Sequence, residues 1–163
     1  MKYYFRVNGG GLFAFFLLLF SMFLPIVSQN LFDFSENSLT PYQLIKGIYI
    51  SVEENEKEQN NTGGMIAVNL NSGEYKISLL VFFALIITYF VSVVLYFLRG
   101  INALGRTPEA IAGILSLVFV FLNFLAVQEF ASQVAQAGFS IGIGSILIGI
   151  IGAATVYHHH KKN

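Results

Sequence analysis

The chain has 163 residues, of which 55% are hydrophobic and only 11% are charged, and its mean hydropathy is +0.68. Soluble domains carry about 25% charged residues, so this composition excludes an ordinary soluble domain and predicts an integral membrane protein. Nine basic and nine acidic residues cancel, and no basic cluster indicates nucleic-acid binding. The absence of cysteine excludes a disulfide scaffold, thiol chemistry and cysteine-ligated metals.

Four apolar runs without a charged residue or histidine are long enough to cross a membrane. They lie at about 11–28, 77–98, 110–127 and 139–157. Each has 18–22 residues, and a helix that rises about 1.5 Å per residue needs about 20 to span a hydrocarbon core of about 30 Å. The predicted fold class is an all-α membrane protein: one domain over 1–163, built as a bundle of four transmembrane helices.

The first apolar run has a second interpretation, because a basic start followed by an apolar stretch is also typical of a secretory signal. The run is long and rich in phenylalanine for such a signal. We therefore expect it to be a retained helix.

The segment 29–75 between the first two runs is the only sizeable polar part of the chain. Its sequence SLTPYQLIKG has a capping residue, a proline and a terminal glycine, which predict a short amphipathic helix at 41–46. The segments 48–52 and 65–70 are typical of short strands that flank a polar span, so we expect a small irregular hairpin. With few large apolar groups, this loop is expected to pack on the helix ends.

The basic residues are distributed unequally between the two sides of the membrane. Six of the nine lie before the first run, between the second and third runs, or after the fourth: Lys2, Arg6, Arg99, Arg106, Lys161 and Lys162. The positive-inside rule places that side in the cytoplasm. We expect a multi-pass protein of the cell membrane with tetraspan topology, both termini cytoplasmic and the loop 29–75 external.

The fourth run is unusual because small residues recur at helical spacing along it. One stripe of about 100° contains Gly138, Gly142, Ser145, Gly149, Gly152 and Ala153. Small residues allow close contact of helices in lipid, so the stripe is predicted to be a helix-packing interface. Packing within the molecule is the favoured interpretation, and an outward-facing stripe that binds a partner is the alternative. Gly144 lies off the stripe, so Gly149→Leu is expected to disrupt packing and Gly144→Ala to be mild.

Small or mildly polar residues also align along the other three runs, which predicts that these faces point inward. Asn123 is the one strongly polar side chain deep in a run and must find a partner. The candidates among the expected buried polar residues are Ser21, Thr88 and Ser92.

The sequence contains no recognisable set of catalytic, cofactor-binding or metal-ligating residues. Intramembrane charges are the usual mark of ion transport or catalysis, and the apolar runs have none. The only histidines are the consecutive His158, His159 and His160. They could bind a metal loosely or contact anionic headgroups, but a solvated helix end is the commoner explanation. The acidic residues at 53–58 lack the order of a calcium loop, and Asn60 begins a glycosylation sequon.

Taken together, these features favour a non-catalytic membrane protein that acts through protein–protein contacts, as an accessory, assembly or scaffold subunit of a membrane complex. Its expected partners are membrane lipids and other membrane subunits or a second copy of itself, not nucleic acid. The alternative is a small transporter or channel for a neutral or apolar solute, lined by Ser21, Thr88, Ser92 and Asn123. An enzyme is the least favoured class.

Overall fold

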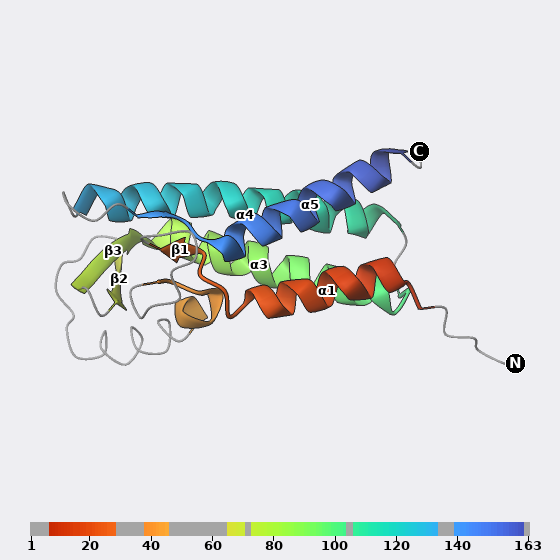
Figure 1. The fold of residues 1–163 in the computed structure, drawn as a ribbon, viewed down its shortest axis with the longest axis horizontal. Coiled ribbons are helices and arrows are strands. Elements are labelled where there is room, and N and C mark those ends of the chain that lie inside the picture. The colour runs from red at the N-terminus through yellow and green to blue at the C-terminus, as the bar shows by residue number, and fades with distance from the viewer. Residues whose placement is uncertain are drawn as a thin grey trace, which may run out of the picture.

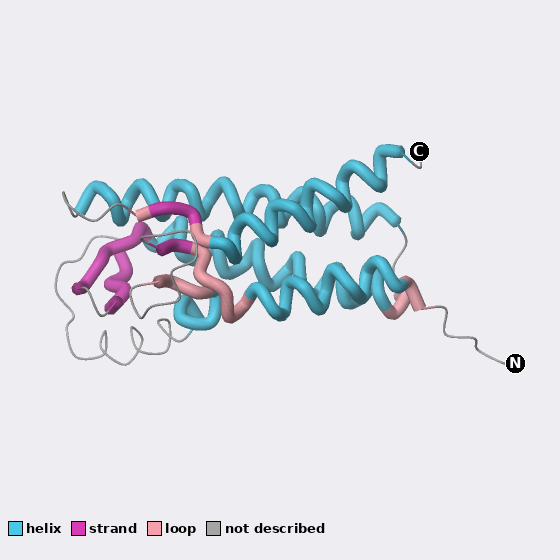
Figure 2. The backbone as a smooth tube through the Cα atoms, viewed as in Figure 1, coloured by secondary structure: helices cyan, strands magenta, loops and turns pink. Residues whose placement is uncertain are grey.

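The computed structural model describes residues 7–28, 38–45, 65–70, 73–103, 106–133 and 139–161. This described part is mostly helical, with two small sheets at one end (Figure 1, Figure 2). Its long helices are α1 (Gly9–Ser21), α3 (Leu79–Gly100), α4 (Arg106–Gln133) and α5 (Ile143–Lys161).

The four long helices lie side by side. Helix α4 packs along both α3 and α5, while α1 packs along α3 and also contacts α5. The start of α1, the α3–α4 connection and the end of α5 share one end of the molecule (Figure 1), which we call the basic end. The sheets occupy the opposite end, which we call the sheet end.

Two helices of the described part are long and apolar enough to cross a membrane: Leu79–Gly100 and Thr107–Gln133. Helix α1 is also apolar but has only 13 residues. Judged by length and composition alone, these helices give weak support for membrane association.

Helix α1 differs from its prediction at both ends. It begins at Gly9, because the Asn8 side chain accepts hydrogen bonds from the backbone N–H groups of Gly10 and Gly11. It ends at Ser21 instead of near residue 28. Pro25 lacks a backbone N–H and disfavours helical conformation in the residue before it. Residues 22–26 are therefore turn and irregular structure.

The chain after α1 pairs with the chain before α5. Strand β1 (Val27–Ser28) is antiparallel to β4 (Ser140–Ile141). The sequence predicts that the fourth helix begins at about 139. In the structure, residues 139–142 are not helical and α5 begins at Ile143. The helix then continues through the three histidines to Lys161.

Helix α4 is longer than its predicted range of 110–127. Thr107, Pro108 and Glu109 lie in its first turn, where proline and an acidic residue are both favourable. At its other end, the helix continues past residue 127 to Gln133.

A β-hairpin precedes α3 in the chain. Strand β2 (Met65–Leu70) pairs in antiparallel fashion with β3 (Gly73–Ser78). The predicted strand 65–70 is therefore present, but its partner is 73–78; the predicted strand 48–52 lies outside the described residues. The backbone N–H of Ser78 donates to the Glu129 carboxylate at 2.7 Å, and α3 begins at the next residue.

A short helix at 41–45 lies against the irregular chain that follows α1. Thr40 and Gln43 form a reciprocal capping box: the Gln43 N–H donates to Thr40 Oγ1 at 3.1 Å, and the Thr40 N–H donates to Gln43 Oε1 at 2.7 Å. Leu39 bridges to Val27. The prediction extended this helix to 46, which lies outside the described residues.

Candidate functional site

Asn123, on α4, is fully buried and contacts the irregular chain that follows α1. Its Nδ2 donates to the Ile26 carbonyl and to Ser145 Oγ, both at 2.7 Å. Within the described residues, its Oδ1 has no hydrogen-bond partner. The partners of Asn123 are thus Ser145 and a backbone carbonyl, and not Ser21, Ser92 or Thr88 as the sequence suggested.

The segments 24–28 and 139–142, which pack near the Asn123 side chain, are not helical, yet backbone groups in them are paired. The Gly142 N–H donates to Ile26 O and the Gly144 N–H to Pro25 O, both at 2.8 Å. The Ile26 N–H donates to Leu39 O at 2.7 Å. An unpaired backbone group in lipid costs several kcal/mol. Because Asn123 adds a further donor to Ile26 O, it fastens the irregular chain to α4.

The other predicted polar residues form no shared lining. Ser21 and Ser92 are buried and Thr88 is half-buried. The Ser21 hydroxyl donates to Leu18 O, one turn back on its own helix, at 2.7 Å. Thr88 and Ser92 likewise donate to carbonyls four residues earlier on α3, at 2.7 and 2.8 Å. Such bonds satisfy each hydroxyl locally.

The small-residue stripe is divided in the structure. Gly142, Ser145 and Gly152 are buried and Gly149 is half-buried, but Ala153 is exposed. Gly138 lies outside the described residues. The buried face of α5 also includes the bulky Ile148 and Ile151. The prediction that Ala153 belongs to the packing face is therefore wrong. The predicted stripe counted Gly142 as part of the helix, but Gly142 precedes α5, and Ala153 lies on the exposed side of that helix.

The glycines of the stripe and its neighbourhood differ in how closely they are packed. A Cβ added at Gly152 would lie 2.8 Å from Gly113 O on α4, whereas one at Gly149 would meet only a Val120 methyl, at 3.3 Å. A Cβ at Gly144 would lie 2.9 Å from the carbonyls of Leu24 and Pro25. The expectation that Gly144→Ala is mild is thus contradicted, because Gly144 packs against the backbone that follows α1.

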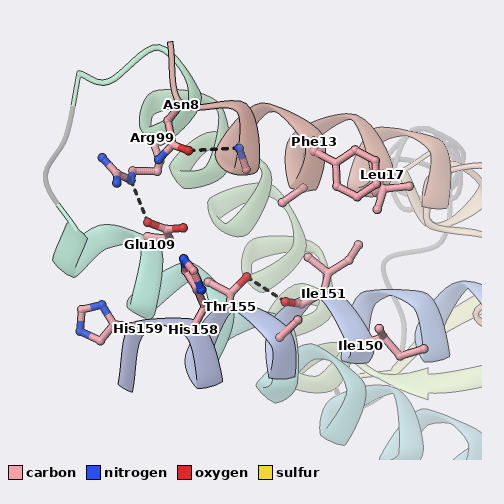
Figure 3. Close-up of a pocket in the computed structure, with 13 residues that line it drawn as sticks. Asn8, Phe13, Leu17, Arg99, Glu109, Ile150, Ile151, Thr155, His158 and His159 are labelled. Atoms are coloured by element: carbon pink, nitrogen blue, oxygen red, sulfur yellow. Dashed lines mark hydrogen bonds and ion pairs between the residues drawn. The ribbon is translucent and has the colours of Figure 1, made fainter. Parts of the chain in front are cut away.

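A pocket of about 520 Å³ lies between α1 and α5 at the basic end (Figure 3). Its wall is apolar and its rim is polar. The apolar wall is formed by Phe13, Ala14, Leu17, Ile150, Ile151 and Ala154. The polar rim is formed by Asn8, Arg99, Glu109, Thr155, His158 and His159.

An ion pair holds the rim together. Arg99 Nε lies 2.8 Å from Glu109 Oε2, and the two side chains are 14% and 19% exposed. Arg99 Nη1 also donates to Asn102 Oδ1 at 3.0 Å. The His158 ring points toward Glu109 (Figure 3). This pair ties the end of α3 to the first turn of α4.

The rim continues inward through a hydroxyl. Thr155 Oγ1 accepts a hydrogen bond from the buried Tyr96 at 2.8 Å and donates to Ile151 O at 2.8 Å. The histidines and Arg99 are recognisable in the sequence, but the pocket that they line is not. Its formation depends on the contact between α1 and α5, which no local pattern specifies.

No protein-family model, curated protein or solved structure matches this chain. Within the described residues, no group of three or more His, Asp or Glu side chains is placed to hold a metal ion.

Proposed function

We propose that this protein is an integral membrane protein with four spanning segments, both termini cytoplasmic, which acts through contacts as an accessory, assembly or scaffold subunit of a membrane complex. The observation that carries the proposal is the apolar outer surface of the helices. Exposed side chains of this kind occur on every long helix: Phe16 and Phe20 on α1, Leu80 and Ile87 on α3, Ile114 and Phe121 on α4, and Ile150 on α5. Soluble monomers rarely expose large apolar patches.

The short α1 is compatible with a membrane span. Its 13 residues, rising about 1.5 Å each, cover about 20 Å of a core of about 30 Å. Residues 22–28 follow it as turn and strand, and Ile26, Val27 and Ser28 are fully buried. Irregular backbone is tolerated at membrane depth where it is buried in protein.

The proposed orientation follows from charge. The basic end includes Arg99, Arg106 and Lys161, which the positive-inside rule assigns to the cytoplasm. The sheet end and the segment 29–75 would then be external.

Action through contacts is favoured because the buried polar groups are largely occupied in holding the fold. Asn123 binds Ser145 and Ile26, while Ser21 and Ser92 bind nearby carbonyls. Because α5 uses its close-packed face against α4, a partner would contact other faces. On α1, three phenylalanines at helical spacing are each at least 60% exposed, Phe13, Phe16 and Phe20, and Phe23 in the turn after the helix is exposed as well.

The alternative function, a transporter for a neutral or apolar solute, receives less support. Its predicted lining residues are Ser21, Thr88, Ser92 and Asn123, and none of them lines the pocket between α1 and α5. Solute flux in reconstituted vesicles that is abolished by Asn123→Leu would favour this alternative.

Purification from native membranes in a mild detergent tests the contact function. We expect a co-purifying membrane protein or a stable homo-oligomer, and a reduced yield of that complex with the double substitution Phe16→Ala and Phe20→Ala. The matched control is Phe121→Ala, which removes an equally exposed phenylalanine from α4. A strictly monomeric protein without a co-purifying partner would contradict the proposal.

A further inference from the structure

The pocket at the basic end opens sideways from between α1 and α5. Phe13 and Ile150 belong to its wall, and they are 66% and 61% exposed. The opening is therefore continuous with the apolar outer surface, where lipid chains would lie in the proposed membrane protein. Its volume of about 520 Å³ falls within the range of about 300–1,000 Å³ typical of ligand sites.

The polar rim stands where a lipid headgroup would lie. Arg99 is held there by Glu109, and His158 and His159 project from the last turns of α5. An acyl chain on the wall below would thus place its phosphate among arginine and histidine side chains. This amphipathic division distinguishes the pocket from a purely apolar groove.

The charge around the rim selects the kind of lipid. Glu109 is compensated by Arg99, and it is the single acidic residue in the described stretches 7–10, 99–103, 106–109 and 158–161. The same stretches contain Arg99, Arg106, Lys161 and the three histidines. Basic pockets between helices on the cytoplasmic side are typical sites for anionic headgroups.

We propose that this pocket binds an anionic phospholipid of the cytoplasmic leaflet, with an acyl chain along Leu17 and Ile151 and the phosphate beside Arg99 and His158. The inference depends on the proposed membrane function and orientation. It goes beyond them by assigning a specific ligand class to one site.

Because the chain contains no tryptophan, a single introduced tryptophan can report on the lipid beside it. Phe13→Trp places the reporter at the pocket mouth. Ile111→Trp is the matched control, since it is exposed on α4 outside the pocket lining. The two positions lie at a similar depth. Phe13 is two residues from Gly11, which packs against Gly100, and Ile111 is two residues from Glu109, which pairs with the neighbouring Arg99.

The experiment compares quenching by brominated phosphatidylglycerol and brominated phosphatidylcholine in mixed vesicles of the two lipids. At Phe13→Trp we expect phosphatidylglycerol to bind about fivefold more tightly than phosphatidylcholine, and at Ile111→Trp the two lipids should quench about equally. The proposal is overturned if the preference for phosphatidylglycerol over phosphatidylcholine is the same at both positions. This holds whether neither position shows a preference or both show one that general surface charge produces.

A second variant tests the headgroup position while both members of the ion pair, Arg99 and Glu109, stay in place. His158→Gln with His159→Gln changes only side chains near the end of α5 and should reduce the preference at Phe13→Trp by at least about twofold. Undiminished preference overturns the assignment of the headgroup to this rim. Cysteine labelling at Ala103 and Lys161 separates the two proposals: external labelling contradicts the orientation, while cytoplasmic placement with equal quenching contradicts only the lipid site.

Discussion

At Asn123, one side chain joins two helices and a stretch of irregular backbone. The apolar run around it indicates burial, but its partners could not be read from the sequence. They depend on the break at Pro25, which places Ile26 O near α4, and on the position of Ser145 beside it. The polar side chains at comparable depth on the expected helices are Ser21, Thr88 and Ser92, but their hydroxyls bond to nearby carbonyls.

Replacement of Asn123 by leucine should lower the stability of the protein by about 1–2 kcal/mol. The loss is moderate because Ile26 O keeps its bond from the Gly142 N–H. Thermal unfolding in detergent, followed by circular dichroism, measures the effect. Ser92→Ala is the control, since its hydroxyl bonds to Thr88 O on the same helix, and a shift as large as that of Asn123→Leu would contradict the assigned role.

Gly144→Ala should destabilise the protein more than Gly149→Ala. The new methyl group at 144 meets the carbonyls of Leu24 and Pro25, whereas at 149 it meets only the movable Val120 side chain. Overpacking of this kind costs about 1–3 kcal/mol at the rigid site. The unfolding midpoints of the two variants, measured in one detergent, show which is less stable. A lower midpoint for Gly149→Ala would show that the chain after α1 moves to accommodate the methyl group at 144.

At the scale of whole elements, composition predicts helices well and their ends poorly. Each of the four apolar runs overlaps a helix, because hydropathy acts locally. The end of α1 follows from Pro25, but the start of α5 at Ile143 depends on β1 and β4 pairing with each other. A two-residue strand that pairs over such a sequence distance leaves no periodic pattern.

The contact between α4 and α5 can be tested with two adjacent residues. Gly152→Leu should prevent close packing, because even a Cβ there would lie 2.8 Å from Gly113 O and 2.9 Å from Ser116 Cβ. We expect a loss of several kcal/mol or failure to fold. Ala153→Leu, on the exposed side of the same helix, should retain the wild-type elution profile and unfolding midpoint. Equal behaviour of the two variants would place the α5 interface elsewhere.

At the scale of the whole molecule, orientation can be measured directly because the chain is naturally free of cysteine. With single substitutions at exposed positions, a membrane-impermeant maleimide should label Tyr42→Cys in intact cells. It should label Ala103→Cys and Lys161→Cys only after the membrane is opened. The unsubstituted chain supplies the blank, and labelling of Ala103→Cys from outside would reverse the proposed topology.

The junction between the hairpin and α3 has a mechanical consequence. Strand β3 ends at Ser78, α3 begins at Leu79, and the Ser78 N–H is fastened to Glu129 near the far end of α4. The hairpin and the helix are joined without a connecting loop. We therefore expect that a tilt of the hairpin moves the first turn of α3, whose opposite end carries Arg99 at the pocket rim.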